Sequence, residues 1–304
     1  MTSARTDGAT ENAAPGGTSG SVSGATMVAS DLDRTLIYSP SALQLPMEDE
    51  LVPNLVSVEV LEGRPHSFMT MAASRRLAEL ARQVIFVPTT TRTMAQYLRV
   101  RFPGVAPRYA ITSNGGNILV DGVPDTNWHR ATESAIAECG ATLAQVRHEL
   151  KARSQDDWAI KRRVGDDLFC YIVVEPSKLP DDFVESWTQW CEDRGWRVSV
   201  QGRKIYSIPL PLTKERAMLA VARRAGAGRV FAAGDGALDA GFLAAADAGI
   251  RPPHGELAAV NWHHPTVEIA PRPGVLAGDD MLAWFGARAG LAVPSDRVLL
   301  SATS

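Results

Sequence analysis

Short apolar segments alternate with segments of helical periodicity along most of this chain, and this alternation limits the fold more than any other feature. Strand-like apolar segments occur at 26–30, 84–88, 109–112, 229–233, 247–250 and 266–269. Helical periodicity occurs at 71–83, 93–101 and 214–226, and the last of these ends at Gly226. Strands that alternate with helices form right-handed crossovers and a parallel sheet covered on both faces. We therefore predict an α/β fold with a Rossmann-like parallel sheet as its core.

The middle of the chain follows a different pattern. Helices are predicted over about 130–152 and 181–194, and each precedes a pair of strands, at 158–164 and 168–174 and then at 196–200 and 204–210. Short turns containing Gly separate the strands of each pair, which predicts antiparallel hairpins. We therefore expect an inserted α+β cap domain at 117–208, between core segments at 26–116 and 209–304.

Three further segments carry weaker expectations. Residues 1–25 are rich in Gly, Ser, Thr and Ala and hold few large apolar side chains, so we expect a disordered tail. The segment 51–71 contains a possible hairpin, which is either structural or a flap over the site. The apolar segment 281–293 is helix-like, and we expect it to pack on the sheet.

The composition disfavours several function classes. The 304 residues carry a formal net charge of −3, which disfavours a general attraction to nucleic acid or to anionic membranes. No apolar run approaches the ~20 residues of a membrane span, and the N-terminus lacks the apolar stretch of a signal peptide. The three cysteines form no CxxC pair, which fits a reducing, cytoplasmic location.

Polar residues follow the strands of the predicted sheet, at the points where the strands end. The set comprises Asp31, Asp33, Arg34 and Thr35, then Thr90, Thr91 and Arg92, then Asn114 and Gly115, and finally Asp235 and Asp239, with Lys214 at the start of the preceding helix. Ligands bind at the carboxyl ends of the strands in open parallel sheets, so we expect these residues to converge at one edge.

This set of residues suits phosphoryl transfer. Carboxylates that lie close together repel one another and commonly share a divalent cation, and Mg²⁺ prefers oxygen ligands. A phosphoryl group also needs cationic and hydrogen-bonding partners, which Lys214 and Thr90 offer. Asp31 and Asp33 are separated by one residue, so one carboxylate can attack phosphorus while the other moves a proton.

Four motifs in this order resemble those of the haloacid dehalogenase (HAD) superfamily. The segments are DLDRT at 31–35, TTR at 90–92, the lysine of PLTKERAM at 214, and GDGALD at 234–239. The insert between the second and third motifs, and the SNGG turn at 113–116, resemble the Cof-like branch with an α/β cap, which includes sucrose-phosphate phosphatases. The resemblance covers about 26–270.

The resemblance implies a role for each residue. Asp31 is expected to be the nucleophile, Asp33 the general acid and base, Thr90 a hydrogen-bond donor to the phosphoryl group, and Lys214 its counter-charge. Mg²⁺ is expected to be held by Asp31, the Asp33 carbonyl and Asp235, with Asp239 as support or ligand. The expected substrate-binding residues are Arg34, Thr35, Thr91, Arg92, Asn114 and Gly115. Arg34 departs from the Gly that this branch often has.

Several alternatives remain at this point. Arg92 serves either substrate contact or packing, and Asn114 serves either a turn or the site. Lys161 and Arg163 lie on the same side of a cap strand, facing either the site or solvent. The leading hypothesis is a Mg²⁺-dependent phosphatase that hydrolyses a small phosphorylated metabolite, a sugar or polyol phosphate. A phosphomutase and a non-catalytic binding or regulatory protein of the same fold are the alternatives.

Overall fold

The structure is a computed structural model that describes residues 24–45 and 47–291. The predicted disordered tail therefore lies outside the described residues, except at its end, where Ala25 already belongs to the first strand. Among the described residues, the helices are too short or too polar to cross a bilayer. The three cysteines carry free thiols, as expected.

The core contains the predicted parallel sheet. Its strands lie in the order β14-β13-β12-β1-β4, and every neighbouring pair is parallel. Their bounds are Ala25–Ser30 for β1, Ile85–Pro88 for β4, Ala227–Ala233 for β12, Ala248–Arg251 for β13 and Val267–Ile269 for β14. The strand β5 (Tyr109–Thr112) lies beside β4 and joins it through a parallel bridge from Thr89 to Ile111.

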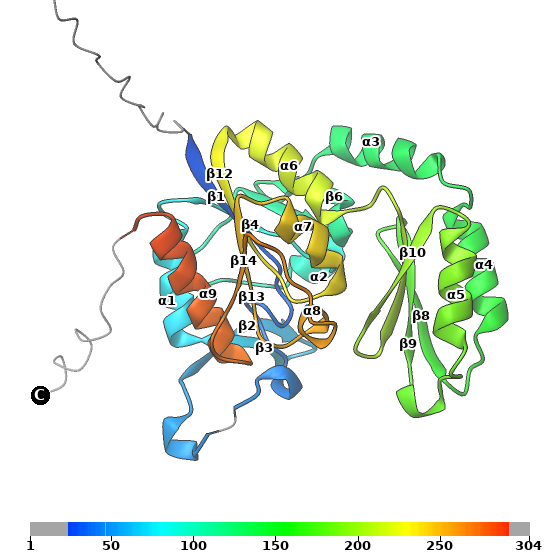
Figure 1. Ribbon diagram of the computed structural model, residues 1–304, viewed down its shortest axis with the longest axis horizontal. Helices are drawn as coiled ribbons and strands as arrows, with labels where there is room; N and C mark the ends of the chain where they lie inside the picture. The colour runs from blue at the N-terminus through cyan, green and yellow to red at the C-terminus, as the bar shows by residue number, and fades with distance from the viewer. Residues whose placement is uncertain (1–23, 46, 292–304) are drawn as a thin grey trace, which may run out of the picture.

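Helices cover both faces of this sheet (Figure 1). One face carries α1 (Met71–Leu80) and α9 (Val275–Arg288), and the other carries α6 (Lys214–Ala225) and α7 (Ala240–Ala244). Successive side chains of a strand point to opposite faces, so Val28 is buried against the first pair of helices while Met27 and Ala29 are buried against the second. The expected packing of the C-terminal helix is confirmed for α9.

The cap is a four-stranded antiparallel sheet, in the order β10-β11-β9-β8, backed by two helices. Its elements are α4 (Leu143–Arg153), β8 (Ala159–Gly165), β9 (Phe169–Val174), α5 (Phe183–Glu192), β10 (Trp196–Gln201) and β11 (Lys204–Pro209). Trp187 and Trp196 are fully buried between helices and sheet. The sheet faces the core, and the helices lie on its outer side (Figure 1).

Two predicted helices are wrong in extent. The helix expected over 130–152 is divided into α3 (Thr126–Ala137) and α4, because Thr142 forms a capping box with Gln145 that starts a new helix. The helix expected over 93–101 is only α2 (Met94–Tyr97). A proline at position 103 disfavours helical backbone before it, and the Arg101 amide instead donates to the Val58 carbonyl at 2.7 Å.

The possible hairpin after the first motif is present as β2 (Leu55–Leu61) and β3 (Arg64–Thr70). Before the cap, β6 (Asn117–Val120) and β7 (Val123–Pro124) continue from β5 as a small antiparallel sheet, so they lie with the core although they fall within the predicted cap range. A short helix, α8 (Glu256–Ala259), follows β13.

Candidate active site

Asp31 and Lys214 meet at the carboxyl end of the parallel sheet. The Asp31 amide donates to the Ala233 carbonyl at 2.8 Å, which holds the end of β1 against β12. Lys214 begins α6 directly after its N-cap, Thr213, and its side chain is 2% exposed. Its ammonium donates to Asp31 Oδ1 at 2.5 Å and to Asp239 Oδ1 at 2.6 Å. Both carboxylates raise the pKa of Lys214 despite its burial, so the side chain is a permanent cation.

Three buried carboxylates form an acidic cluster, defined here as Asp31, Asp235 and Asp239. Each offers an oxygen within 4.8 Å of the others. Burial raises the pKa of Asp31 to about 7 against the opposing charge of Lys214, and burial with the charges of Asp31 and Asp239 raises the pKa of Asp235 to about 9. One ammonium thus compensates three acids incompletely, and a divalent cation with oxygen ligands fits this set.

The members of this cluster are not equivalent as ligands. Both oxygens of Asp239 already accept hydrogen bonds, one from Lys214 and the other from the Gly236 amide at 2.9 Å. Asp239 therefore suits a supporting role, whereas Asp31 and Asp235 have oxygens to offer. Asp235 has a looser partner in Arg34, whose Nε lies 3.7 Å from Asp235 Oδ2.

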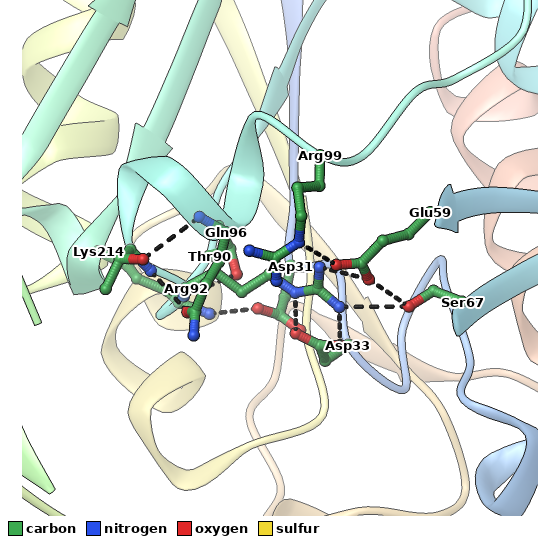
Figure 2. A network of polar contacts seen from close by, with 10 residues as sticks. Asp31, Asp33, Glu59, Ser67, Thr90, Arg92, Gln96, Arg99 and Lys214 are labelled. Carbon is green, nitrogen blue, oxygen red and sulfur yellow. Dashed lines mark hydrogen bonds and ion pairs between the residues drawn. The ribbon is translucent and has the colours of Figure 1, made fainter. Parts of the chain in front are cut away.

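The Asp33 side chain points toward Arg92 (Figure 2). Arg92 Nε donates to Asp33 Oδ2 at 2.7 Å, and Arg92 Nη2 donates to Oδ1 at 2.8 Å, a bidentate pair. Burial by itself would raise the pKa of Asp33, but the Arg92 guanidinium holds it below its ordinary value. The Asp33 side chain nevertheless stays 53% exposed toward the cavity, so the carboxylate is oriented and accessible.

On its other side, Arg92 contacts residues that the sequence did not predict to belong to the site. Its Nη1 donates to Glu59 Oε2 at 2.8 Å, and Nη2 approaches Ser67 Oγ at 3.3 Å. Arg99 donates to the second Glu59 oxygen at 3.1 Å. We call Asp33, Arg92, Glu59, Ser67 and Arg99 the arginine network. A glutamate inside a largely apolar strand segment is the sequence signal for it.

A cavity of about 550 Å³ joins these two groups. From the predicted set it is lined by Asp31, Asp33, Arg34, Thr90, Thr91, Arg92, Lys214, Asp235 and Asp239. Thr90 is buried, and its Oγ1 accepts from the Arg92 amide at 3.1 Å, which leaves its own O–H free to donate. The β2–β3 hairpin, for which a structural role and a flap over the site were the two alternatives, contributes Glu59 and His66 to the cavity lining.

Three residues expected to bind substrate lie outside the cavity lining. Thr35 is fully buried. Asn114 donates from Nδ2 to the Leu212 carbonyl at 2.8 Å. Gly115 has φ +94°, and a Cβ there would lie 2.1 Å from the Thr213 carbonyl oxygen. Asn114 and Gly115 therefore support the segment that places Lys214, which corrects their expected role; packing decides this, because side-chain type alone does not.

Arg34, which stands where the related branch often has glycine, has a backbone conformation that favours glycine. Its φ is +62°, a conformation that glycine adopts freely and other residues adopt at a cost. His254 Nε2 bonds the Arg34 carbonyl at 2.8 Å, and His254 Nδ1 accepts from the Gly274 amide at 3.2 Å, so the loop is held in place. The Arg34 side chain is 42% exposed and lines the cavity.

The cap presents a different cation from the two considered above. Lys161 and Arg163 lie on β8, at the far edge of the cap sheet from β10, and neither lines the cavity. The hairpin of β10 and β11 reaches the core instead, and it contributes Gln201, Gly202, Lys204 and Tyr206. The cap therefore offers the cavity a cation, and that cation is Lys204.

Comparisons with known proteins support the fold. No family model matches the chain, and no curated protein matches it. Among solved structures, the sucrose-phosphatase from Synechocystis sp. PCC6803, in complex with sucrose and phosphate, matches with a TM-score of 0.62 and 14% identity, over 88% of this chain and 98% of that chain.

Two further structures agree. A trehalose-6-phosphate phosphatase related protein matches with a TM-score of 0.53 and 14% identity, over 87% of this chain and 98% of that one. A HAD subclass IIB sugar phosphatase matches with a TM-score of 0.51 and 12% identity, over 88% and 100%. At such identities the likeness concerns the fold, and the chain has the fold of the capped phosphatases of the HAD superfamily.

Proposed function

We propose that the protein is a Mg²⁺-dependent phosphatase that hydrolyses a small phosphate monoester through an aspartyl-phosphate on Asp31. The observation that carries the proposal is the pairing of a buried carboxylate, Asp31, with the Lys214 ammonium at 2.5 Å, beside an accessible second carboxylate, Asp33. A nucleophile, a fixed counter-charge and a proton carrier at the carboxyl end of a parallel sheet are the parts that phosphoryl transfer needs.

In the first step, an Asp31 carboxylate oxygen attacks phosphorus and the bond from phosphorus to the leaving oxygen breaks. Asp33 gives its proton to that oxygen, so the alcohol leaves neutral. The negative charge of the arriving phosphate favours the protonated form of Asp33, which opposes the effect of Arg92. Lys214 and the Thr90 hydroxyl face the phosphoryl oxygens and stabilise their charge.

In the second step, water attacks phosphorus, Asp33 takes a proton from the water, and the bond between Asp31 and phosphorus breaks. Inorganic phosphate leaves, Asp31 is again a carboxylate, and Asp33 is again protonated as it was before the first step. Arg92 holds the pKa of Asp33 below its ordinary value, so after the first step Asp33 stays ionised, which is the form that can accept a proton from water.

A magnesium ion would be held by Asp31 and Asp235, with the Asp33 carbonyl as a further ligand and Asp239 in support. When bound, it supplies Lewis-acid charge to the phosphoryl oxygens. Without Mg²⁺, carboxyl groups of the acidic cluster retain protons near neutral pH, and a protonated carboxyl group is a poor nucleophile.

The charges of the cavity favour an uncharged leaving group. Its lining holds five cationic side chains, Arg34, Arg92, Arg99, Lys204 and Lys214, against six carboxylates, Asp31, Asp33, Glu59, Asp235, Asp239 and Glu256. With a divalent ion bound and Asp33 protonated for the first step, the lining carries two net positive charges, which match one phosphoryl dianion and leave none for a second anion. We therefore propose a sugar or polyol phosphate as substrate. From the cysteine pattern and the net charge, we further propose that the protein acts in the cytoplasm, with no nucleic-acid or membrane partner.

The test is phosphate release from sugar phosphates, nucleotides and p-nitrophenyl phosphate, with and without Mg²⁺, by the wild type and by Asp31→Asn. Release that needs Mg²⁺ and vanishes in the variant is the expected result. Return of the phosphoryl group to the sugar instead of water, with a requirement for a bisphosphate activator, would identify a mutase. No release above the variant on any ester would overturn the proposal.

A further inference from the structure

Glu59 lies at an irregularity in the β2–β3 hairpin. The strand register shifts on both sides of Glu59, between Ser57 and Glu59 and again between Glu59 and Val60. In a regular strand, neighbouring side chains point to opposite faces, yet Val58 and Glu59 are both 1% exposed. A β-bulge re-aims a side chain in this way, and bulges are frequent next to active sites. The hairpin therefore turns a carboxylate inward at a position where regular pairing would place it outside.

The inward carboxylate has a full set of partners. Ser67 Oγ donates to Glu59 Oε2 at 2.7 Å, Arg92 Nη1 donates to the same oxygen at 2.8 Å, and Arg99 Nε donates to Oε1 at 3.1 Å. Burial alone would raise the pKa of Glu59, but the hydrogen bond from Ser67 and the charge of Arg92 hold it below its ordinary value. Glu59 is thus a charged group with no exposed side-chain surface.

These contacts form one continuous line of alternating charge. Asp33, Arg92, Glu59 and Arg99 follow one another as acid, base, acid and base (Figure 2). Side-chain exposure falls from 53% at Asp33 to 12% at Arg92 and 0% at Glu59, and it rises again to 35% at Arg99. The buried carboxylate of Glu59 is therefore the anchor of the line, and Asp33 is the carboxylate that faces the cavity.

Arg92 has little left to offer a substrate. Its guanidinium makes four hydrogen bonds, two to Asp33, one to Glu59 and one to Ser67. An arginine has five N–H donors, so four of them are engaged. Arg92 was expected either to bind substrate or to serve in packing. Its N–H donors are instead directed to Asp33, another side chain of the site.

A contribution to stability does not account for this arrangement. The desolvation of a buried ion pair offsets most of its attraction, and apolar residues of similar volume often serve equally well. A group that must be held in one orientation does benefit, because catalysis is sensitive to misplacements of about 1 Å.

We propose that Glu59 is a positioning residue that acts through Arg92 on Asp33, and that the hairpin thereby directs the Asp33 carboxyl toward the leaving-group oxygen. This inference rests on the proposed phosphatase function. It assigns a part in leaving-group protonation to a strand that carries none of the four motifs. Arg99 and Ser67 keep Glu59 in place from its other sides.

The experiment compares esters whose leaving groups differ in their need for a proton. p-Nitrophenolate departs as a stable anion, whereas phenol, with a pKa of about 10 like tyrosine, and a sugar alcohol benefit from protonation. In Glu59→Gln we expect kcat/KM to fall about 10- to 100-fold for phenyl phosphate and for the best sugar phosphate, and less than about threefold for p-nitrophenyl phosphate. The ratio kcat/KM excludes the later attack of water, so the base role of Asp33 does not enter.

Two control variants distinguish a positioning role of Glu59 from general damage to the structure. Glu62→Gln makes the same charge change at an exposed site on the same hairpin and should alter neither ester. In the Asp33→Asn background, Glu59→Gln should no longer change the ratio between esters, because its effect passes through Asp33. An equal fall for all esters in Glu59→Gln, or no fall, would overturn the proposal.

A second measurement does not depend on activity. The Arg92 Nε–H proton, assigned through its loss in Arg92→Lys, should exchange slowly with solvent in the wild type and at least about tenfold faster in Glu59→Gln, because the anchor is lost. Unchanged exchange would refute the anchoring. If the wild type releases no phosphate from any ester, the proposed function fails, and the exchange result alone still decides whether Glu59 holds Arg92.

Discussion

The acidic cluster and the arginine network lie at the same cavity, but their charges are arranged in opposite ways. In the acidic cluster, one ammonium faces three carboxylates, and the pKa values of Asp31 and Asp235 are raised. In the arginine network, two acids alternate with two arginines, and the pKa values of Asp33 and Glu59 are lowered. The first region is incomplete without a further cation, whereas the second is complete by itself.

This difference separates the roles of two aspartates that are two positions apart in the chain. Asp31 lies in a site that awaits positive charge, which suits a nucleophile activated together with a metal ion. Asp33 lies in a charge-balanced frame, which suits a group that exchanges protons in a fixed orientation. The same residue type thus suits two different proposed roles because of its surroundings.

The largest effect should come from Asp31→Asn. Removal of a catalytic nucleophile costs on the order of 10⁴-fold or more in kcat, so phosphate release should be lost. Asp33→Asn should lose about 10²- to 10⁴-fold on a sugar phosphate, because a general acid contributes that much, and clearly less on p-nitrophenyl phosphate. The measurement is steady-state phosphate release at saturating Mg²⁺. Equal losses on both esters in Asp33→Asn would erase the distinction between the two regions.

The next effect should be a fall in the stability of the metal-free protein as the pH rises. Asp235 has an ordinary pKa of 3.8 when unfolded and about 9 when folded without metal, so the folded protein retains a proton that the unfolded chain has lost. Metal-free stability should therefore fall as pH rises toward 9, by up to about 1.4 kcal/mol per pH unit for this group. Thermal melts in EDTA between pH 7 and 9 measure the fall.

Two comparisons make that result specific. Mg²⁺ binding requires deprotonated ligands, so the gain in Tm on adding Mg²⁺ should grow over the same pH range. Asp235→Asn should show neither the fall nor the gain. A metal-free wild type with constant Tm from pH 7 to 9 would contradict the description of the acidic cluster as undercompensated.

A smaller effect should appear at Arg34, which lies beside the acidic cluster. Arg34→Gly and Arg34→Ala both remove the cation near Asp235, but only glycine adopts a φ of +62° without strain. The glycine variant should be more stable than the alanine variant by about 1 kcal/mol. Urea unfolding of the two variants gives the difference directly, and equal midpoints would mean that the loop relaxes.

The smallest effect should come from the cap. Lys204 lines the cavity, whereas Lys161 is exposed elsewhere on the cap sheet. Exposed ion pairs contribute at most about 1 kcal/mol, so Lys204→Ala should raise KM roughly two- to fivefold with kcat unchanged. Lys161→Ala should change neither constant. A change in kcat for Lys204→Ala would place this side chain with the reacting groups instead.

Much of the fold follows from local patterns. The apolar runs and turn residues predicted the strands of both sheets to within a few residues, since alternation and turn chemistry are properties of short segments. The helix boundaries failed where a capping box began a new helix at Thr142 and where a proline at position 103 shortened α2. Both signals are also local, but the spacing of apolar residues does not contain them.

The sequence by itself determined the parallel core, the inserted cap and the residues at the strand ends, because residues that follow parallel strands must meet at one edge of a sheet. Tertiary structure alone decided which of them face the cavity. Asn114 and Gly115 support the segment before Lys214 because packing leaves them no other space. Glu59 joins the site because a bulge turns it inward toward Arg92, 33 residues away in the chain. Such contacts depend on the register of a strand and on the packing of distant segments, and no short stretch of sequence contains either.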